Sequence, residues 1–218
     1  MKTMMAELRP LRTMTLLHCL GLALAVLLVT SASTLAQGLP GTENGEWRYL
    51  GGNAGQLMVL EREHAEDADL IKGIEGAGVI YFTGGSPDHL LAAIRDSHLW
   101  SAILAAMERG TVLAGSSAGA MVMGSLMRRP RLGQWVEALA VATGIAVLPH
   151  HERSNPEETS RDLQGQVPPD TIVFGIDART GCLGSPGNWR VVGSGKVTVY
   201  RGTEWSVYQS GDNLSSDV

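Results

Sequence analysis

The sequence has few cysteines and no excess of positive charge. Cys19 and Cys182 are the two cysteines among 218 residues, so neither a disulfide framework nor a cysteine-rich metal site supports the fold. Lysine and arginine total 17 against 22 aspartates and glutamates, a net charge of −5. Proteins that bind the phosphate backbone of nucleic acids need a basic surface, so nucleic acid is not expected as a partner. The 44% hydrophobic and 18% charged content indicates a folded globular protein.

The first 36 residues have the layout of a secretory signal. Lys2, Arg9 and Arg12 precede an apolar run at residues 16–29, and small residues follow up to Ala36. The run is short for a membrane-spanning helix, so we expect cleavage after Ala36 and export to the periplasm or the cell exterior. The alternative is an uncleaved N-terminal anchor, the one case in which a membrane is a partner.

Beyond the leader, the sequence predicts a short linker and then one domain. Residues 37–46 are polar and rich in turn formers, and residues 47–218 alternate short apolar runs with longer amphipathic ones. Strands are expected at residues 57–60, 78–82, 111–114, 145–148 and 171–176. Helices are expected at residues 67–74, at 87–109 with Ser86 as cap, from 118, and from 156. This alternation predicts an α/β fold with a mostly parallel sheet and helices on both faces.

Two finer expectations concern the long helix and the end of the chain. The helix at residues 87–109 should bury one side, formed by Leu90, Leu91, Ile94, Leu99, Ile103 and Leu104. Residues 189–192, 196–200 and 204–208 are short segments separated by tight turns. They predict antiparallel ribbons at the edge of the sheet.

The stretch VLAGSSAGAM, residues 112–121, places Gly-x-Ser-x-Gly between a predicted strand and a predicted helix. This is the arrangement of a nucleophile elbow, a turn too tight for side chains beside the serine, followed by backbone amides that face a developing anion. Ser117 is at the centre of the motif and is the candidate nucleophile. Ser116 is the alternative, although its side chain would point elsewhere from the same turn. A packing turn without catalytic function is the simpler interpretation of such a short motif.

Three features together resemble the S51 serine peptidases, which include dipeptidase E and cyanophycinase, and the related type 1 glutamine amidotransferase-like proteins. They are a strand ending in Gly84 and Gly85, the Gly-x-Ser-Ala-Gly-Ala turn at 115–120, and GIAVLPHHER at 144–153. The resemblance spans about residues 47–210. It implies a three-layer fold of the class I glutamine amidotransferase type, a serine-type peptidase activity on a small peptide or amide, and no metal or organic cofactor.

The resemblance also implies roles for individual residues. Ser117 would attack the carbonyl, His150 would act as the base, and the amides of Gly85 and Ala118 would form the oxyanion hole. A serine hydroxyl is a poor nucleophile until a base takes its proton. His150 follows a predicted strand, so it can reach the carboxyl-end rim where Ser117 lies. The neighbouring His151 leaves the choice of base open, and the Pro-His pattern of the family favours His150.

The acid of the triad is the least defined part of the predicted site. Relatives have a Gly-Ile-Asp-Glu-like segment, whereas this chain has Gly-Ile-Asp-Ala at residues 175–178, with Ala178 in place of the glutamate. Asp177 is the favoured acid, although neighbouring strand residues point to opposite faces. Glu152 is the alternative, because His150-x-Glu152 matches the His-x-Glu pair of class I glutamine amidotransferases. A solvated surface carboxylate is the non-catalytic interpretation of either residue.

Relatives usually have an additional βαβ unit before the part that starts near Trp47, where this sequence has the leader and linker. A truncated gene, a mistaken start or a partner that fills the gap would each explain the difference. Loss of the βαβ unit would expose a sheet edge. The leading hypothesis is an exported serine peptidase, with a homo-oligomer left open. Its rivals are a non-catalytic binding protein of the same fold and a glutamine amidotransferase-like domain, which the serine disfavours because that class uses cysteine.

Overall fold

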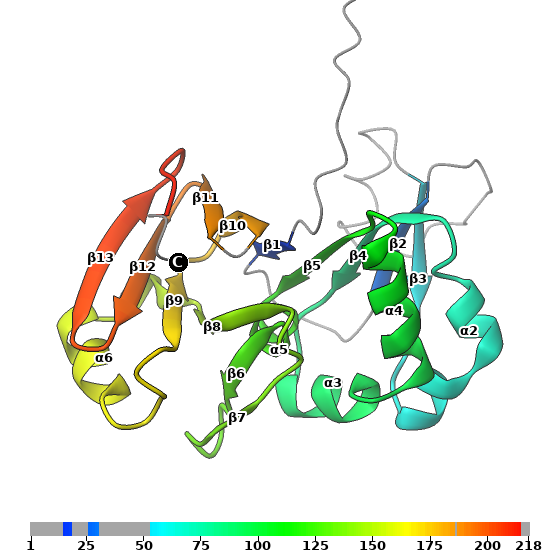
Figure 1. The fold of residues 1–218 in the computed structure, drawn as a ribbon, viewed down its shortest axis with the longest axis horizontal. Coiled ribbons are helices and arrows are strands. Elements are labelled where there is room, and N and C mark those ends of the chain that lie inside the picture. The colour runs from blue at the N-terminus through cyan, green and yellow to red at the C-terminus, as the bar shows by residue number, and fades with distance from the viewer. Residues whose placement is uncertain (1–14, 19–25, 31–52, 186, 215–218) are drawn as a thin grey trace, which may run out of the picture.

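Two mixed β-sheets lie side by side in the computed structural model, which describes residues 15–18, 26–30, 53–185 and 187–214 (Figure 1). In spatial order, the seven-stranded sheet contains β11 (Asn188–Gly193), β10 (Thr180–Ser185), β1 (Thr15–His18), β5 (Val112–Ser116), β4 (Ala77–Phe82), β2 (Val26–Thr30) and β3 (Asn53–Leu57). The six-stranded sheet contains β13 (Glu204–Gln209), β12 (Lys196–Arg201), β9 (Ile172–Ile176), β8 (Ala142–Pro149), β6 (Gly124–Arg128) and β7 (Trp135–Glu137).

Parallel pairing is confined to the middle of each sheet. β5 is parallel to both β1 and β4, and β8 is parallel to both β6 and β9. The other strand pairs among the described residues are antiparallel. The predicted C-terminal ribbons are confirmed for β12 with β13, whereas β11 pairs with β10, a strand that was not predicted, in the other sheet. The expected α/β fold is therefore a mixed one, and its mostly parallel character is confirmed only in part.

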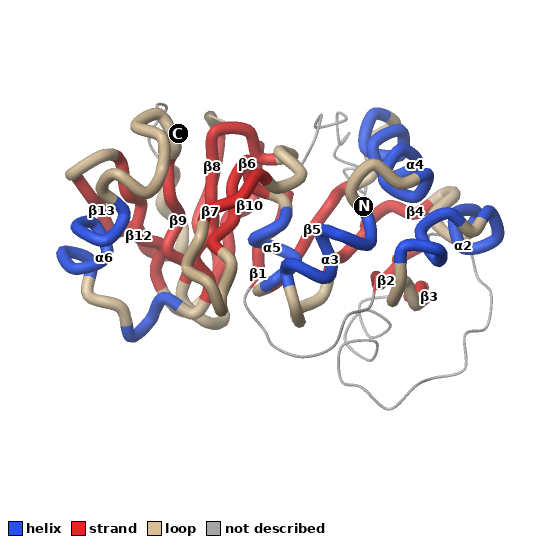
Figure 2. The backbone as a smooth tube through the Cα atoms, turned by 90° about the horizontal axis from the view of Figure 1, so that it is seen from below, coloured by secondary structure: helices blue, strands red, loops and turns tan. Residues whose placement is uncertain are grey.

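Short helices accompany the sheets. They are the 3-10 helices η1 (Arg62–Glu66) and η2 (His151–Arg153), and the α-helices α2 (Ala68–Lys72), α3 (Pro87–Ile94), α4 (His98–Glu108), α5 (Ala118–Val122) and α6 (Pro156–Leu163). Figure 2 shows α6 beside the six-stranded sheet and α2, α3 and α4 around the other one. α5 contacts β4, β5, β6 and β8, so it lies at the junction of the two sheets.

The single helix expected at residues 87–109 is wrong, because the chain forms two helices there. Ser86 caps α3 as expected, with its side chain accepting from the His89 amide. Asp96 then takes a left-handed conformation with φ of 57°, which ends the first helix. Ser97 caps α4 by accepting from the Trp100 amide at 2.9 Å. Leu104 lies on the outer side of α4 at 41% exposure, whereas the other five residues expected on the buried side are buried.

The strand expected at residues 57–60 is also displaced. β3 ends at Leu57, and the exposed Met58 and Leu60 follow it. The amides of Leu60 and Glu61 donate to Nδ1 of His64 at 3.2 Å each, so the chain turns into η1 instead of continuing the strand. An apolar residue count alone did not distinguish a strand from this turn.

Two strands of the seven-stranded sheet come from the segment predicted to be a leader. β1 pairs with β5 and β10, and β2 pairs with β4 and β3. Cleavage after Ala36 and the linker at residues 37–46 fall outside the described residues and stay predictions. A chain cleaved there would lack both strands. Within the described segments, no helix combines the length and apolar content needed to cross a membrane.

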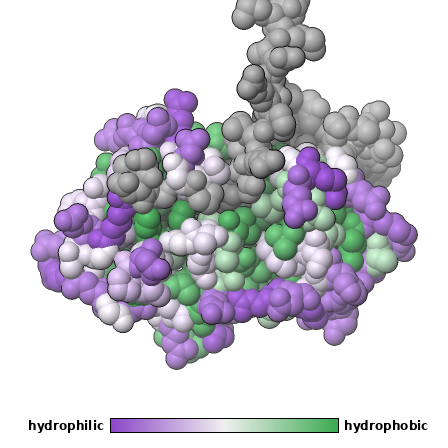
Figure 3. Space-filling model, viewed as in Figure 1, coloured by the Kyte–Doolittle hydropathy of each residue, from purple (hydrophilic) through white to green (hydrophobic). Residues whose placement is uncertain are grey.

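One hydrophobic core connects the two sheets. The same buried cluster contains Phe82 of β4, Met123 after α5, Val147 of β8, Phe174 of β9 and Trp189 of β11. The face shown in Figure 3 is hydrophilic along its rim, with apolar residues toward the middle. This shared core fixes the end of β5 relative to the end of β8, where the candidate site lies.

Candidate active site

Ser117 lies on a strained turn between β5 and α5. Its backbone has φ of 50° and ψ of −111°, outside the regions that a serine normally occupies. Such a conformation costs about 1–3 kcal/mol and persists only where the surrounding structure fixes it. Ser117 is partly exposed, whereas the neighbouring Ser116 is only 2% exposed. The turn therefore presents Ser117 at the surface and keeps Ser116 in the interior.

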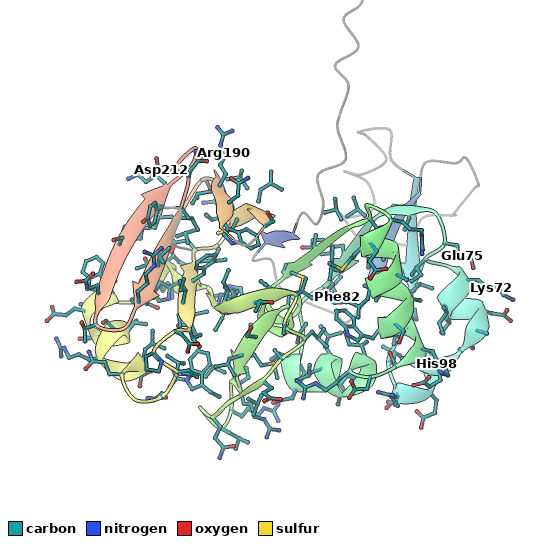
Figure 4. All side chains as sticks on the ribbon, in the orientation of Figure 1. Lys72, Glu75, Phe82, His98, Arg190 and Asp212 are labelled. Atoms are coloured by element: carbon teal, nitrogen blue, oxygen red, sulfur yellow. The ribbon has the colours of Figure 1, made fainter. Side chains whose placement is uncertain are left out.

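The two glycines of the motif are required by close packing. A Cβ on Gly115 would lie 2.6 Å from the carbonyl carbon of Gly119, which is too short for a contact. A Cβ on Gly119 would collide with the carbonyl oxygen of Phe82 at the end of β4. Phe82 is fully buried and is labelled in Figure 4, where it lies toward the interior of the molecule. Strand, turn and helix thus pack too closely for any side chain at these two positions.

His150 comes from the other sheet and reaches the serine. It follows β8 directly and has a left-handed backbone conformation, with φ of 58° and ψ of 44°. Its Nε2 lies 3.2 Å from Oγ of Ser117, within hydrogen-bonding distance. The structure therefore brings together the two residues that the sequence proposed as nucleophile and base, across the junction of the two sheets.

The residues proposed for the oxyanion hole, Gly85 and Ala118, follow two neighbouring strands of the seven-stranded sheet. Ala118 is the first residue of α5, so its amide has no partner within the helix. Gly85 lies in the exposed loop between β4 and α3, with a φ of 137° that favours glycine. Both loops follow the carboxyl ends of adjacent parallel strands, β5 and β4. Their amides are therefore available at the rim of the sheet where Ser117 lies.

Asp177, the favoured acid, is turned away from His150. Its Oδ2 accepts from the amide of Lys196 at 3.1 Å, and its own amide donates to the Lys196 carbonyl at 3.1 Å. The carboxylate is 6% exposed, and its Oδ1 has no hydrogen-bond partner in the described structure. Its charge raises the pKa of His151. No hydrogen bond joins Asp177 to His150 within the described part of the chain.

Glu152, the alternative acid, lies on the same short helix turn as His150. Its Oε2 accepts from the amide of Ala178 at 3.0 Å. Hydrogen bonds to backbone amides, chiefly its own and that of Ala178, lower the pKa of Glu152, and the charge of His150 lowers it further. Glu152 is thus anchored to the backbone of Ala178, the residue that replaces a glutamate in the sequence comparison above. It also interacts electrostatically with His150.

A buried histidine and a buried tyrosine beside the site form a contact that the sequence did not predict. His151 is 4% exposed, and its Nε2 lies 2.6 Å from the hydroxyl of Tyr200 on β12. Desolvation by burial lowers the pKa of His151 and raises that of Tyr200, so both are neutral near pH 7. The doubled histidine in the sequence was the available clue, but it was interpreted only as a choice between two bases.

A pocket of about 770 Å³ opens beside the proposed oxyanion residue Gly85. Asp88 and Arg129 face it and form an ion pair, with Nε of Arg129 2.8 Å from Oδ1 of Asp88. Arg131 also faces it and is exposed, with no ion pair to any described residue. The described residues contain no cluster of three or more His, Cys, Asp or Glu side chains placed to hold a metal ion.

Comparison with known proteins identifies the family of this chain. The model of peptidase family S51 matches residues 26–180. The chain belongs to peptidase family S51. The matched range runs from β2 through β9 and includes the serine turn and His150. It begins at the first residue of β2, inside the segment predicted as a leader. No curated protein matches the sequence of this chain.

One solved structure of a peptidase has a similar fold. A peptidase from an acI-B1 Actinobacterium is 30% identical, with a TM-score of 0.69 over 79% of this chain and 73% of that one. A protein from Listeria monocytogenes EGD-e, whose name assigns it to the peptidase E proteins, is 18% identical, with a TM-score of 0.40 over 65% of this chain and 64% of that one. Family membership and the first of these structures support a peptidase function.

Proposed function

We propose that this S51 family member is a serine-type peptidase that cleaves a small peptide or amide bond, with Ser117 as nucleophile and His150 as base. The observation that carries the proposal is the 3.2 Å separation between Oγ of Ser117 and Nε2 of His150. A base at hydrogen-bonding distance is what a serine hydroxyl needs to become nucleophilic. The strained turn that presents Ser117 is further support, because strain of this kind clusters at active sites.

The proposed reaction follows from the positions of these groups. Nε2 of His150 takes the hydroxyl proton while Oγ of Ser117 bonds to the substrate carbonyl carbon, and the carbonyl oxygen becomes an oxyanion. The amides of Gly85 and Ala118 donate to that oxyanion. His150 then returns the proton to the leaving amine as the carbon–nitrogen bond breaks, and water releases the acyl group from Ser117 by the same route.

For the acid that orients His150, the contacts favour Glu152 over Asp177. Glu152 is anchored to the amide of Ala178, and its pKa responds to His150. Asp177 is bound to the backbone of Lys196 and acts on His151. Glu152 therefore stabilises the imidazolium form of His150 during the reaction in this proposal, and Asp177 organises the end of β9.

The proposed substrate is a small peptide that carries a carboxylate. Resemblance to dipeptidase E points to short peptides with an acidic first residue, and resemblance to cyanophycinase points to the β-linked Asp-Arg polymer. Arg131 in the pocket beside Gly85 supports the first, because its charge has no partner among the described residues and can bind a substrate carboxylate. The arginine-rich segment that follows the histidine in cyanophycinases is reduced here to Arg153 and Arg161.

The test is hydrolysis of a dipeptide panel that includes Asp-X, Ala-X and β-Asp-Arg, followed by mass spectrometry, with Ser117→Ala as the inactive control. We expect release of the first residue from Asp-X peptides by the parent only. Arg131→Gln should raise KM for Asp-X with a smaller change in kcat, and Arg109→Gln, at the other end of β5, should change neither. A folded parent that hydrolyses no member of the panel would contradict the peptidase proposal and favour a binding role.

Export is a separate proposal. It rests on the charged start, the apolar run and the small residues before position 37. The same segment supplies β1 and β2 to the sheet, so one molecule cannot both lose the leader and keep these strands. The mass of the protein isolated from cells decides between the two outcomes. Loss of residues 1–36 would support export with cleavage. An intact N-terminus would support either an uncleaved anchor or a chain that keeps β1 and β2 in the sheet.

A further inference from the structure

The residue after the proposed base is buried and bonded in the interior, whereas the base itself is exposed. His150 is exposed and has a left-handed backbone that a non-glycine residue adopts only when its surroundings fix it. His151 is buried and starts the short helix η2. Because the two residues are adjacent, the position of the His151 ring determines where the peptide plane and side chain of His150 lie.

The space for the His151 ring is made by a glycine on the next strand. A Cβ at Gly175 of β9 would collide with the ring of His151, because it would lie only 2.7 Å from Cγ of His151. Gly175 does not have a positive φ, so its lack of a side chain serves this packing and not an unusual backbone conformation. The ring is therefore seated directly against the backbone of the sheet.

Tyr200 closes the other side of this seat. Its hydroxyl is 2.6 Å from Nε2 of His151, and the two rings meet edge to face, with centroids 5.6 Å apart and planes at 81°. Tyr200 is 2% exposed on β12, which pairs with β9. A hydrogen bond between two neutral buried groups is directional, so it fixes the rotation of the ring as well as its depth.

We propose that His151 and Tyr200 are positioning residues for His150: their buried contact fixes the turn from which His150 reaches Ser117. The inference rests on the proposed function, in which His150 is the base. It assigns the second histidine of the pair a mechanical role, because its ring is bonded to Tyr200 in the interior while Nε2 of His150 faces Ser117.

Two substitutions remove the contact and retain the bulk of the rings. Tyr200→Phe removes the hydroxyl alone, and His151→Phe removes Nε2. Each should slow the labelling of Ser117 by a fluorophosphonate about 10- to 100-fold, since a displacement of about 1 Å between reacting groups has an effect of this size. The double variant should be no slower than the slower single variant, because both substitutions remove the same interaction.

Val199→Ala is the matched control for a purely structural effect. Val199 precedes Tyr200 on β12, is 3% exposed and packs in the main core, whereas Tyr200 packs in a separate cluster on the other face of the strand. Val199→Ala should lower the melting temperature at least as much as Tyr200→Phe and leave the labelling rate unchanged. Equal slowing by all three variants would reduce the role of Tyr200 to general stability and overturn the proposal.

A readout that needs no activity separates this inference from the proposed function. In full-length protein labelled with ¹⁵N-histidine, the ring signals of His150, assigned with His150→Gln, should shift in Tyr200→Phe and His151→Phe but not in Val199→Ala. If the parent is not labelled by fluorophosphonate, the peptidase proposal fails, and these signals alone decide the positioning role. Unchanged His150 signals in both variants would overturn it whether or not Ser117 reacts.

Discussion

The two sheets contribute to the candidate site in different ways. The seven-stranded sheet supplies Ser117 on a turn whose geometry is set by residues close in sequence, Gly115 and Gly119. The six-stranded sheet supplies His150, whose position depends on contacts with Gly175 of β9 and Tyr200 of β12, which follow it by 25 and 50 residues in the chain. The nucleophile is thus locally encoded, and the base depends on tertiary structure.

This difference determines which substitutions can displace the nucleophile and which can displace the base. A change within the serine turn acts on the nucleophile directly, through backbone collisions. A change far from His150 in sequence can displace the base while the serine turn stays intact. Deletions and substitutions can therefore test one sheet at a time.

Deleting residues 1–36 should have the largest effect, and it should be confined to one sheet at first. The deletion removes β1 and β2, which pair with β5 and β4, and leaves every strand of the six-stranded sheet in the chain. We expect amide hydrogen exchange to show lost protection in β4 and β5 and residual protection in β8, β9 and β12. Full protection of β4 and β5 in the shortened protein would instead support a removable leader.

Gly119→Ala should come next, with a loss of about 3 kcal/mol or more in the free energy of unfolding. The new methyl group meets the Phe82 carbonyl, which belongs to a strand and cannot move aside. Gly165→Ala is the control, because that glycine has a φ of 72° and open space, so it reports the backbone cost alone, about 1–2 kcal/mol. Urea unfolding of both variants measures the difference, and equal losses would show that the turn is not closely packed.

Glu152→Gln should lower kcat/KM on an Asp-X dipeptide about 10²-fold, the lower end of the range for acid–base catalysis, because Glu152 is exposed and partly screened by water. Asp177→Asn, which retains the hydrogen bond to the Lys196 amide, should leave kcat/KM close to that of the parent. The reverse order of the two variants would assign the acid to Asp177.

The smallest expected effect is a pH dependence of stability from His151. Its folded pKa lies below the value of 6.5 for an unperturbed histidine, mainly because burial disfavours the charged ring, so the unfolded chain binds a proton first as the pH falls. Its contribution is therefore complete above pH 6.5 and is lost as the pH falls toward the folded pKa. Asp177 and Glu152 raise this pKa and Lys196 lowers it.

Urea unfolding between pH 7.5 and 5 measures this dependence. His151→Phe should have a flatter profile in that range, since it has no group to titrate there. Glu152 does not interfere, because its pKa lies below 4.5 and its contribution is lost only under more acidic conditions. Identical profiles for parent and variant would contradict the assignment of the pH dependence to His151.

The sequence predicted the serine turn well because its determinants are local. Spaced glycines and a preceding apolar strand each have a physical requirement that residue type reveals, and the same is true of the cap that Ser86 and Pro87 form at the start of α3. The break at Asp96 was missed because the apolar periodicity continues through it, and only the capping serine at position 97 marks the second helix. β10 was missed because its small residues, TGCLGS, lack the alternation typical of a strand.

Other features could not be predicted because they depend on contacts between distant segments. An apolar run such as residues 26–29 suits a signal sequence and a buried strand equally well, and pairing with β4 and β3 is a tertiary property. The interaction of Glu152 with His150 depends on how η2 packs against the end of β9, which places the Ala178 amide beside Glu152. The partner of His151 lies 49 residues away.

Labelling by a fluorophosphonate tests the claim that Ser117 and His150 form a reactive pair. The intact mass of the full-length protein is measured after treatment, beside Ser117→Ala and His150→Gln. If Ser117 of one sheet and His150 of the other form a reactive pair, the parent gains one adduct, Ser117→Ala gains none, and His150→Gln reacts far more slowly than the parent. A folded parent without an adduct, or a His150→Gln variant that reacts at the parent's rate, would contradict the claim.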